Sequence, residues 1–380
     1  MWKREFIEGL VLVVFAVTLV GGMATASADD SSSILKQLKN INVITSTVPA
    51  NGDINPYGIV EVKNTVGGLH RGHILISNFN SMANQQGTGT TIMDIAPDGS
   101  ITTFAQIDAT KLPGPCPGGV GLTTALTVLR TGWVIVGSLP TSDGTSATAQ
   151  AGCLLVLNNS GNVVETLTDA SINGPWDMTS IDGDDGAHLF VTNVLNGTVA
   201  ANGAVVNQGT ILRIDLAVSL AQMPQVKAMT VIGSDFSERT DPAALVIGPT
   251  GVGLSPACAG EDGDDCALYV ADSLNNRIAA IFNPLSRRHS AGTGLTVSSG
   301  GSLNDPLGLT VAPNGHILVV NGDDGFITEI TPRGKQVAKV LLDNTGGPPP
   351  GNGTLFGVIF DPLRGVLFVD DGSNTLNSLN

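Results

Sequence analysis

The stretch DPLGLTVAPNGHILVVN, residues 305–321, decides the fold. It begins with Pro-x-Gly, continues as an apolar strand, turns at Pro-Asn-Gly and returns as a second apolar strand that ends on Asn321. Residues 325–331 then give a third strand, and residues 335–341, after an Arg-Gly turn, give a fourth. Four antiparallel strands joined by hairpins make one blade of a β-propeller.

The same pattern recurs along the chain at intervals of roughly 50 to 75 residues, a period typical of propeller repeats. The five further copies begin at Pro56, Gly119, Pro175, Pro249 and Leu355. The last copy ends one strand early, and the β-branched stretch 41–48 can supply its outer strand, which would leave no open sheet edge. The sequence therefore predicts an all-β fold: one six-bladed β-propeller of four-stranded antiparallel blades over residues 41–380, closed by an N-terminal strand.

The amino terminus has the features of a secretory signal peptide. Lys3 and Arg4 precede an apolar run over residues 10–20, and the small residues 26–28 offer a cleavage site after Ala28. The run is shorter than the roughly 20 residues of a spanning helix, although retention as an anchor stays open. We expect a signal peptide over residues 1–28, a linker or short helix over residues 29–40, and a periplasmic or secreted protein.

Composition narrows the partners and the role of the cysteines. A net charge of −15 argues against nucleic acid, which needs a basic surface. Four cysteines allow three pairings. Cys258 and Cys266 flank a short acidic loop, which favours one bridge there and a second between Cys116 and Cys153, both structural, because no CxxC spacing suggests zinc. We expect a monomer with no membrane span after signal cleavage.

Residues 269–278, YVADSLNNRI, resemble the core of the NHL repeat. The resemblance extends from about residue 43 to the carboxyl end and is strongest in the fourth copy. It implies a fold like that of virginiamycin B lyase, the peptidylglycine amidating lyase and gluconolactonase-like metal hydrolases. Because the same fold also hosts pure interaction modules, the resemblance does not choose an activity.

If the NHL orientation applies, the residue between Pro and Gly in each copy lies at the channel mouth. Tyr57, Trp176 and Phe356 occupy three of these positions and are predicted to bind ligand through their aromatic faces, the alternative being burial beneath neighbouring loops. The next residue is glycine in five copies but Asp177 in the third. This departure makes Asp177 a candidate ligand-binding or catalytic residue, with capping of backbone amides as the alternative.

Oxygen-bearing side chains at the ends of the second strands are candidate metal ligands. Asn193, Asp272, Asn321 and Asp370 would suit a divalent cation such as calcium, although Asn and Asp in repeated turns also form local hydrogen bonds. The histidines His73, His188 and His316 share one repeat position, which predicts three separate side chains and no metal triad.

These features favour a binding or scaffold protein that uses the channel mouth for a small molecule, a glycan or a protein segment. Long polar loops over residues 79–89, 139–152 and 194–208 belong to the first three copies, and loops of this kind are suited to recognition. The alternative is a metal-assisted lyase or lactonase in which Asp177 acts as metal ligand or base. Whether the protein is an enzyme stays open.

Overall fold

The computed structural model describes residues 33–183, 186–220, 222–260 and 265–380. The predicted signal peptide and part of each acidic turn, at residues 182–186 and 261–265, lie outside these ranges. A search of the described helices for one long and apolar enough to cross a membrane finds none.

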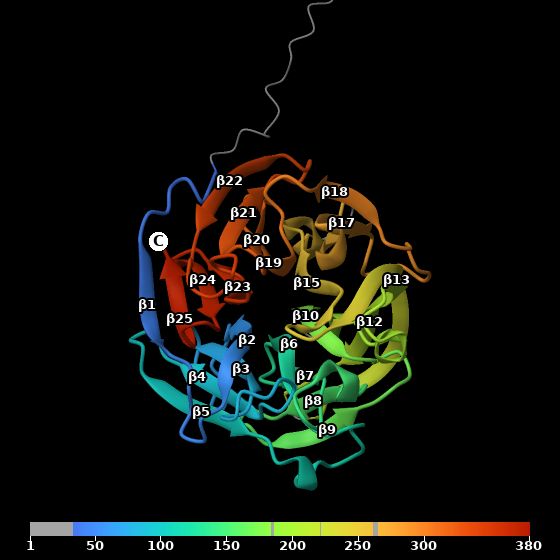
Figure 1. Cartoon of the computed structure of the whole chain (residues 1–380). Helices are drawn as coiled ribbons and strands as arrows, with labels where there is room; N and C mark the ends of the chain where they lie inside the picture. The colour runs from blue at the N-terminus through green and yellow to red at the C-terminus, as the bar shows by residue number, and fades with distance from the viewer. Residues whose placement is uncertain (1–32, 184–185, 221, 261–264) are drawn as a thin grey trace, which may run out of the picture. The chain divides into compact units, whose positions relative to one another are not determined.

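The described chain forms six antiparallel sheets arranged as the blades of a ring, which confirms the predicted propeller (Figure 1). The blades are formed, in chain order, by β2 (Ile54–Glu61), β3 (Ile74–Asn80), β4 (Thr91–Ile95) and β5 (Ile101–Gln106); by β6 (Leu122–Val128), β7 (Val134–Ser138), β8 (Cys153–Leu157) and β9 (Val163–Leu167); by β10 (Pro175–Asp182), β11 (Gly186–Asn193), β12 (Val206–Ala217), β13 (Gln225–Asp241) and β14 (Leu245–Ile247); by β15 (Pro249–Leu254), β16 (Ala267–Asp272), β17 (Arg277–Phe282) and β18 (Leu295–Ser299); by β19 (Pro306–Val311), β20 (Ile317–Asn321), β21 (Phe326–Ile330) and β22 (Gln336–Leu341); and by β23 (Leu355–Asp361), β24 (Gly365–Asp370), β25 (Thr375–Leu379) and β1 (Ile41–Ser46). The third blade carries the extra short strand β14, and a short helix, α1 (Thr198–Ala201), lies in its long loop.

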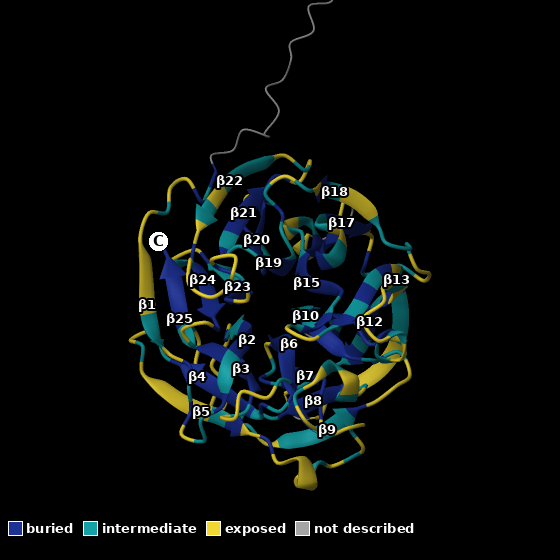
Figure 2. Ribbon diagram, viewed as in Figure 1, coloured by how far each residue is buried: buried dark blue, intermediate teal, exposed yellow. Residues whose placement is uncertain are grey.

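Strands near the middle of the ring are more deeply buried than strands at its rim. The first strand of each blade touches the first strands of both neighbouring blades, so the six inner strands surround a central channel. Strands such as β3 and β8 are buried along their whole length, whereas the outer strand β5 is largely exposed (Figure 2). The core therefore lies between blades.

The two ends of the chain meet in the sixth blade, as predicted. Strand β1 pairs antiparallel with β25, from Ile41 opposite Leu379 to Ser46 opposite Thr375. The blade is thus built from both chain termini, and the ring has no gap at this point (Figure 1).

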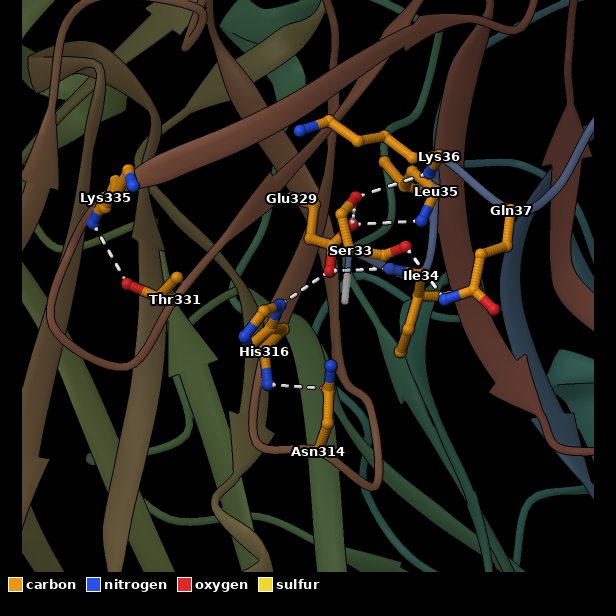
Figure 3. Close-up of polar contacts among 10 residues, drawn as sticks. All are labelled: Ser33, Ile34, Leu35, Lys36, Gln37, Asn314, His316, Glu329, Thr331 and Lys335. Atoms are coloured by element: carbon orange, nitrogen blue, oxygen red, sulfur yellow. Dashed lines mark hydrogen bonds and ion pairs between the residues drawn. The ribbon is translucent and has the colours of Figure 1, made fainter. Parts of the chain in front are cut away.

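Residues before β1 are fixed to the fifth blade through Glu329, a fully buried side chain on β21 (Figure 3). Its carboxylate accepts hydrogen bonds from the Ser33 hydroxyl at 2.6 Å, from the Ile34 amide at 3.0 Å and from the Leu35 amide at 2.9 Å. It also pairs with His316 Nδ1 at 2.6 Å. Burial alone would raise the pKa of Glu329, but these hydrogen bonds outweigh it and lower that pKa. The segment predicted as a linker or short helix forms a turn over residues 34–37.

Both disulfide predictions are confirmed. Cys116 is bonded to Cys153 at the start of β8, and Cys258 is bonded to Cys266 just before β16. The two bonds close chain segments of very different length, with sequence separations of 37 and 8 residues.

We predict that deletion of residues 41–46 destabilises the sixth blade more than the second and third. Without β1, strand β25 becomes an exposed edge and loses its outer backbone partners. Hydrogen exchange of backbone amides in β24 and β25 should accelerate by about tenfold or more, while amides of β7 and β8 change little. Equal acceleration in all blades would show that β1 is not the closing element.

We predict that the two disulfides contribute unequally to stability. Because constraint of the unfolded chain grows with loop length, replacing Cys116 and Cys153 by serine should cost about 4 kcal/mol, and replacing Cys258 and Cys266 about 2.5 kcal/mol. Urea unfolding of both double variants measures the difference. The reverse order would contradict the loop-entropy explanation.

Candidate functional site

The inner strands approach one another most closely at the glycine that follows Pro-x. A Cβ atom on Gly308 would lie 1.9 Å from the carbonyl oxygen of Phe356 in the next blade. A Cβ on Gly357 would lie 2.3 Å from the carbonyl oxygen of Tyr57. No side chain fits these two gaps, so both junctions require glycine. In the second blade the equivalent residue is Ala125 and not Gly121, because β6 pairs Leu122 with Ser138 and Leu126 with Val136.

Asp177 occupies the equivalent position between the third and fourth blades. Its amide donates to Thr192 Oγ1 at 2.9 Å, and the Met178 amide donates to Asp177 Oδ1 at 2.7 Å. Burial raises the pKa of Asp177 to about 8, although the backbone amides of Met178 and Val252, the latter in the next blade, act to lower it. At neutral pH the side chain is therefore mostly a neutral carboxylic acid.

Tyr57, Trp176 and Phe356 form a buried aromatic cluster with Phe79. Their exposed fractions are 2%, 1% and 6%. The Tyr57 ring stacks on Phe356, with centroids 3.7 Å apart, and on Phe79 at 4.5 Å, while Trp176 meets it edge-on at 5.9 Å. These side chains therefore do not line an open mouth, and their role in ligand binding stays a prediction.

A hairpin formed by the end of β13 and by β14 closes this end of the channel. We call residues 236–247 the cap hairpin; Leu245 and Val246 in it are buried in the same apolar core as the aromatic cluster. Gln86 Nε2, from the first blade, donates to the carbonyl of Ala243 in the hairpin turn at 2.7 Å. The repeat pattern does not predict this hairpin, because residues 225–247 carry no Pro-x-Gly signal; their run of strand-forming residues was the available clue.

The channel contains a cavity of about 420 Å³. Tyr57 and Asp177 line its closed end, and Glu61, Lys63, Arg130 and Asp182 line the other. The side chains of Lys63 and Arg130 are 63% and 62% exposed, so this second end is the one that meets solvent. The open end thus lies at the turns between first and second strands, opposite the end that the repeat pattern indicated.

One apolar residue from each inner strand lines this cavity at an equivalent register position, and most of its side chain is buried in the core between blades. We call this set the apolar collar: Ile59, Leu126, Met178, Val252, Leu309 and Val358. Hydroxyl groups follow toward the open end, where Thr127 and Ser180 bond to each other at 2.6 Å. The Arg130 amide donates to Asp182 Oδ2 at 2.7 Å, and Lys63 pairs with Glu61.

The predicted metal ligands lie in four different blades, and each has a local partner. Asn193 Oδ1 accepts from the Asn173 amide at 2.9 Å, and Asp272 forms an ion pair with Arg277 at 2.7 Å. Asn321 Nδ2 donates to the Ser302 carbonyl, and Asp370 Oδ1 accepts from the Ser373 amide. Within the described ranges, no three His, Cys, Asp or Glu side chains are grouped so that they could hold a metal ion. Metal binding by these residues stays a prediction.

Each of the three repeated histidines pairs with a carboxylate on the third strand of its own blade. His73 bonds to Asp94 at 2.8 Å, His188 to Asp215 at 2.6 Å and His316 to Glu329 at 2.6 Å. These pairs link the second and third strands within three separate blades.

Three other carboxyl groups, which we call the cap-side carboxyls, have raised pKa values. Burial raises the pKa of Glu238, in the cap hairpin, to about 8, although the backbone amide of Asn196 acts to lower it. Burial, then Asp323 and Asp241, raise the pKa of Asp305 to about 7. Burial, followed by neighbouring carboxylates, raises the pKa of Asp371 to about 8.

No protein-family model matches the chain, and no curated protein is significantly similar to it in sequence. Many solved structures share its fold. A gluconolactonase from Xanthomonas campestris has a TM-score of 0.52 at 12% identity, over 89% of this chain and 88% of that one. The calcium-binding protein regucalcin from Agrobacterium tumefaciens has a TM-score of 0.52 at 13% identity, over 90% and 94% of the two chains. A streptogramin B lyase has a TM-score of 0.50 at 14% identity, over 92% and 99%.

This chain has the six-bladed propeller fold of these proteins. Identities of this size establish the fold alone, because one propeller fold serves several activities. Membership of the NHL-repeat family stays a prediction.

We predict that the protein is more stable at pH 5 than at pH 9. A carboxyl group whose pKa is higher in the folded than in the unfolded state contributes stability below its unfolded pKa, near 4, and loses it as the pH rises through the folded value. Asp177 and the cap-side carboxyls all titrate in this sense, with folded values of about 7 to 8. The melting temperature should fall by about 5 °C or more between these pH values.

The variant Asp177→Asn isolates the contribution of Asp177 to this pH dependence, because it keeps the shape of the side chain and removes its charge. Its melting temperature at pH 9 should equal or exceed that of the wild type, and its pH dependence should be weaker. A melting temperature that rises from pH 5 to pH 9 in the wild type would contradict the raised pKa values.

Proposed function

We propose that this protein is an extracytoplasmic binding protein that holds one small molecule in its central channel, which the ligand reaches from the end opposite the cap hairpin. The observation that carries the proposal is the cavity of about 420 Å³ that ends at Asp177. Its volume lies within the range of roughly 300 to 1,000 Å³ that is typical of ligand pockets.

The chemistry of the lining supports this function. The apolar collar offers contact area, while the hydroxyls beyond it offer directional hydrogen bonds, a combination typical of small-molecule sites. Asp177 stands at a position that is glycine in four of the six inner strands, and its pKa is strongly raised by burial. Departures and perturbed carboxyl groups of this kind concentrate at functional sites.

The long loops of the first and third blades have a structural role, because they hold the cap hairpin through hydrogen bonds. Thr240 Oγ1 in the hairpin accepts a hydrogen bond from the Gly203 amide, and Ser237 Oγ bonds to Asn207 Oδ1. Gln86 holds the hairpin turn from the first blade. Recognition of a glycan or a protein segment at this face would have to use the outer surface of these loops.

An extracytoplasmic location agrees with the two disulfides, since such bonds persist in oxidising compartments. The predicted signal peptide would supply the export. The location is tested by fractionation of cells that produce the full chain.

The alternative function is that of a metal-assisted lyase or lactonase. It has precedent in the fold, since two neighbours are described as a gluconolactonase and a lyase and a third as calcium-binding. For this chain it would need a cation close to Asp177, and the metal ligands expected from the sequence belong to separate blades. Metal analysis of protein purified without chelator, followed by assays on lactones and esters, tests this alternative.

We predict that Val252→Phe abolishes binding in the channel by filling the apolar collar. The fluorescent probe 1-anilinonaphthalene-8-sulfonate should bind to the folded variant about tenfold more weakly than to the folded wild type, or not at all. Leu363→Phe is the matched control, because it adds the same ring at a surface position that is 96% exposed. Equal binding by all three proteins would show that the channel is not the site.

A further inference from the structure

We infer, on the basis of the proposed function, that the ligand is an apolar molecule with a neutral carbonyl oxygen at its leading end, and that the Asp177 carboxyl group donates a hydrogen bond to this oxygen. This assigns both the class of ligand and its orientation in the channel. The carbonyl would lie beyond the apolar collar, and the rest of the molecule would extend toward the open end.

Asp177 lies where the leading end of a ligand would stop. It lines the closed end of the cavity, next to the aromatic cluster, so a ligand that enters from the open end reaches it last. The Met178 amide donates to Oδ1, the Asp177 amide donates to Thr192, and the backbone amide of Val252 also bonds to the carboxyl group, so these contacts hold the carboxyl group of Asp177 at the wall of the cavity. The hydroxyl of Thr124 bonds to the Trp176 carbonyl and fixes the adjacent wall.

The leading end of the ligand must be uncharged, because a charge is costly to remove from water. A charged group pushed past the apolar collar would lose its hydration without gaining a counter-ion, which is strongly unfavourable. A neutral oxygen loses much less, and one hydrogen bond from a carboxylic acid replaces its bond to water. Because the pKa of Asp177 is about 8, the acid form that can donate this bond predominates at pH 7.

The other titratable groups that line the cavity lie at its open end or stay neutral. Glu61 and Lys63 pair at the open end, as do Arg130 and Asp182. At the closed end, burial, followed by Asp371, raises the pKa of Tyr57 well above its usual value, so its hydroxyl stays protonated. Among the described residues that line the closed end, Asp177 is therefore the one whose charge changes between pH 6 and pH 9.5.

The experiment compares two molecules of nearly equal shape, 4-phenyl-2-butanone and butylbenzene, as competitors of 1-anilinonaphthalene-8-sulfonate. At pH 6 the ketone should bind about tenfold more tightly than the hydrocarbon, as expected for one additional buried hydrogen bond. At pH 9.5, where Asp177 is ionised, this preference should disappear, because a carboxylate cannot donate. Butylbenzene should bind equally at both pH values.

Three variants make the test specific. Asp177→Asn keeps an N–H donor and cannot ionise, so it should retain the preference for the ketone at both pH values. Asp177→Leu removes the donor and leaves the ketone oxygen without a partner, so this variant should bind butylbenzene more tightly than the ketone. Asp98→Asn, in an exposed turn between β4 and β5, is the control and should behave like the wild type.

The outcomes distinguish this inference from the function on which it rests. If both molecules compete equally in the wild type at pH 6, or if Asp177→Leu still prefers the ketone, the inference is overturned while channel binding stands. If neither molecule competes and Val252→Phe leaves probe binding unchanged, the proposed function fails as well.

Discussion

Ring closure depends on backbone contact between neighbouring inner strands. Where the second residue after proline is glycine, the strand lies directly against the carbonyl of the next blade, and even one Cβ atom would collide. Asp177 replaces this contact with a carboxyl group that lies between the third and fourth blades. The same constraint explains its burial and its raised pKa, because a side chain that substitutes for a tight backbone contact cannot stay hydrated.

The two ends of the channel differ in what covers them. The third blade extends through β13 into the cap hairpin, and loops of the first and third blades hold it in place. Tyr57, Trp176 and Phe356 become core residues under this hairpin. The aromatic positions thus stabilise the closed end, while access falls to the turns at the opposite end.

The sequence was sufficient for features that depend on local pattern. Alternating strands, turns at fixed offsets and short Cys spacing predicted the blades, the closing strand and both disulfides, and the register of the repeat made Asp177 visible as a departure. The burial of Tyr57 could not be read in this way, because it depends on residues 236–247, which lie outside the repeat and far from Tyr57 in the chain. The pKa of Asp177 likewise depends on Val252 in the following blade, a neighbour that only the closed ring supplies.

The carboxyl groups beside the cap hairpin and the carboxyl group in the channel titrate over the same range of pH. Glu238, Asp305 and Asp371 at the closed end lose their protons as the pH rises through about 7 to 8, and Asp177 does so at about 8. Below this range the cap hairpin lies against neutral groups and the channel holds a neutral acid; above it, unpaired charges develop on both sides of the aromatic cluster. A buried asparagine at position 177 would offer a donor at every pH. A carboxyl group instead ties the donor to the same conditions that keep the cap closed, so the chemistry of the channel and the stability of its closed end change together.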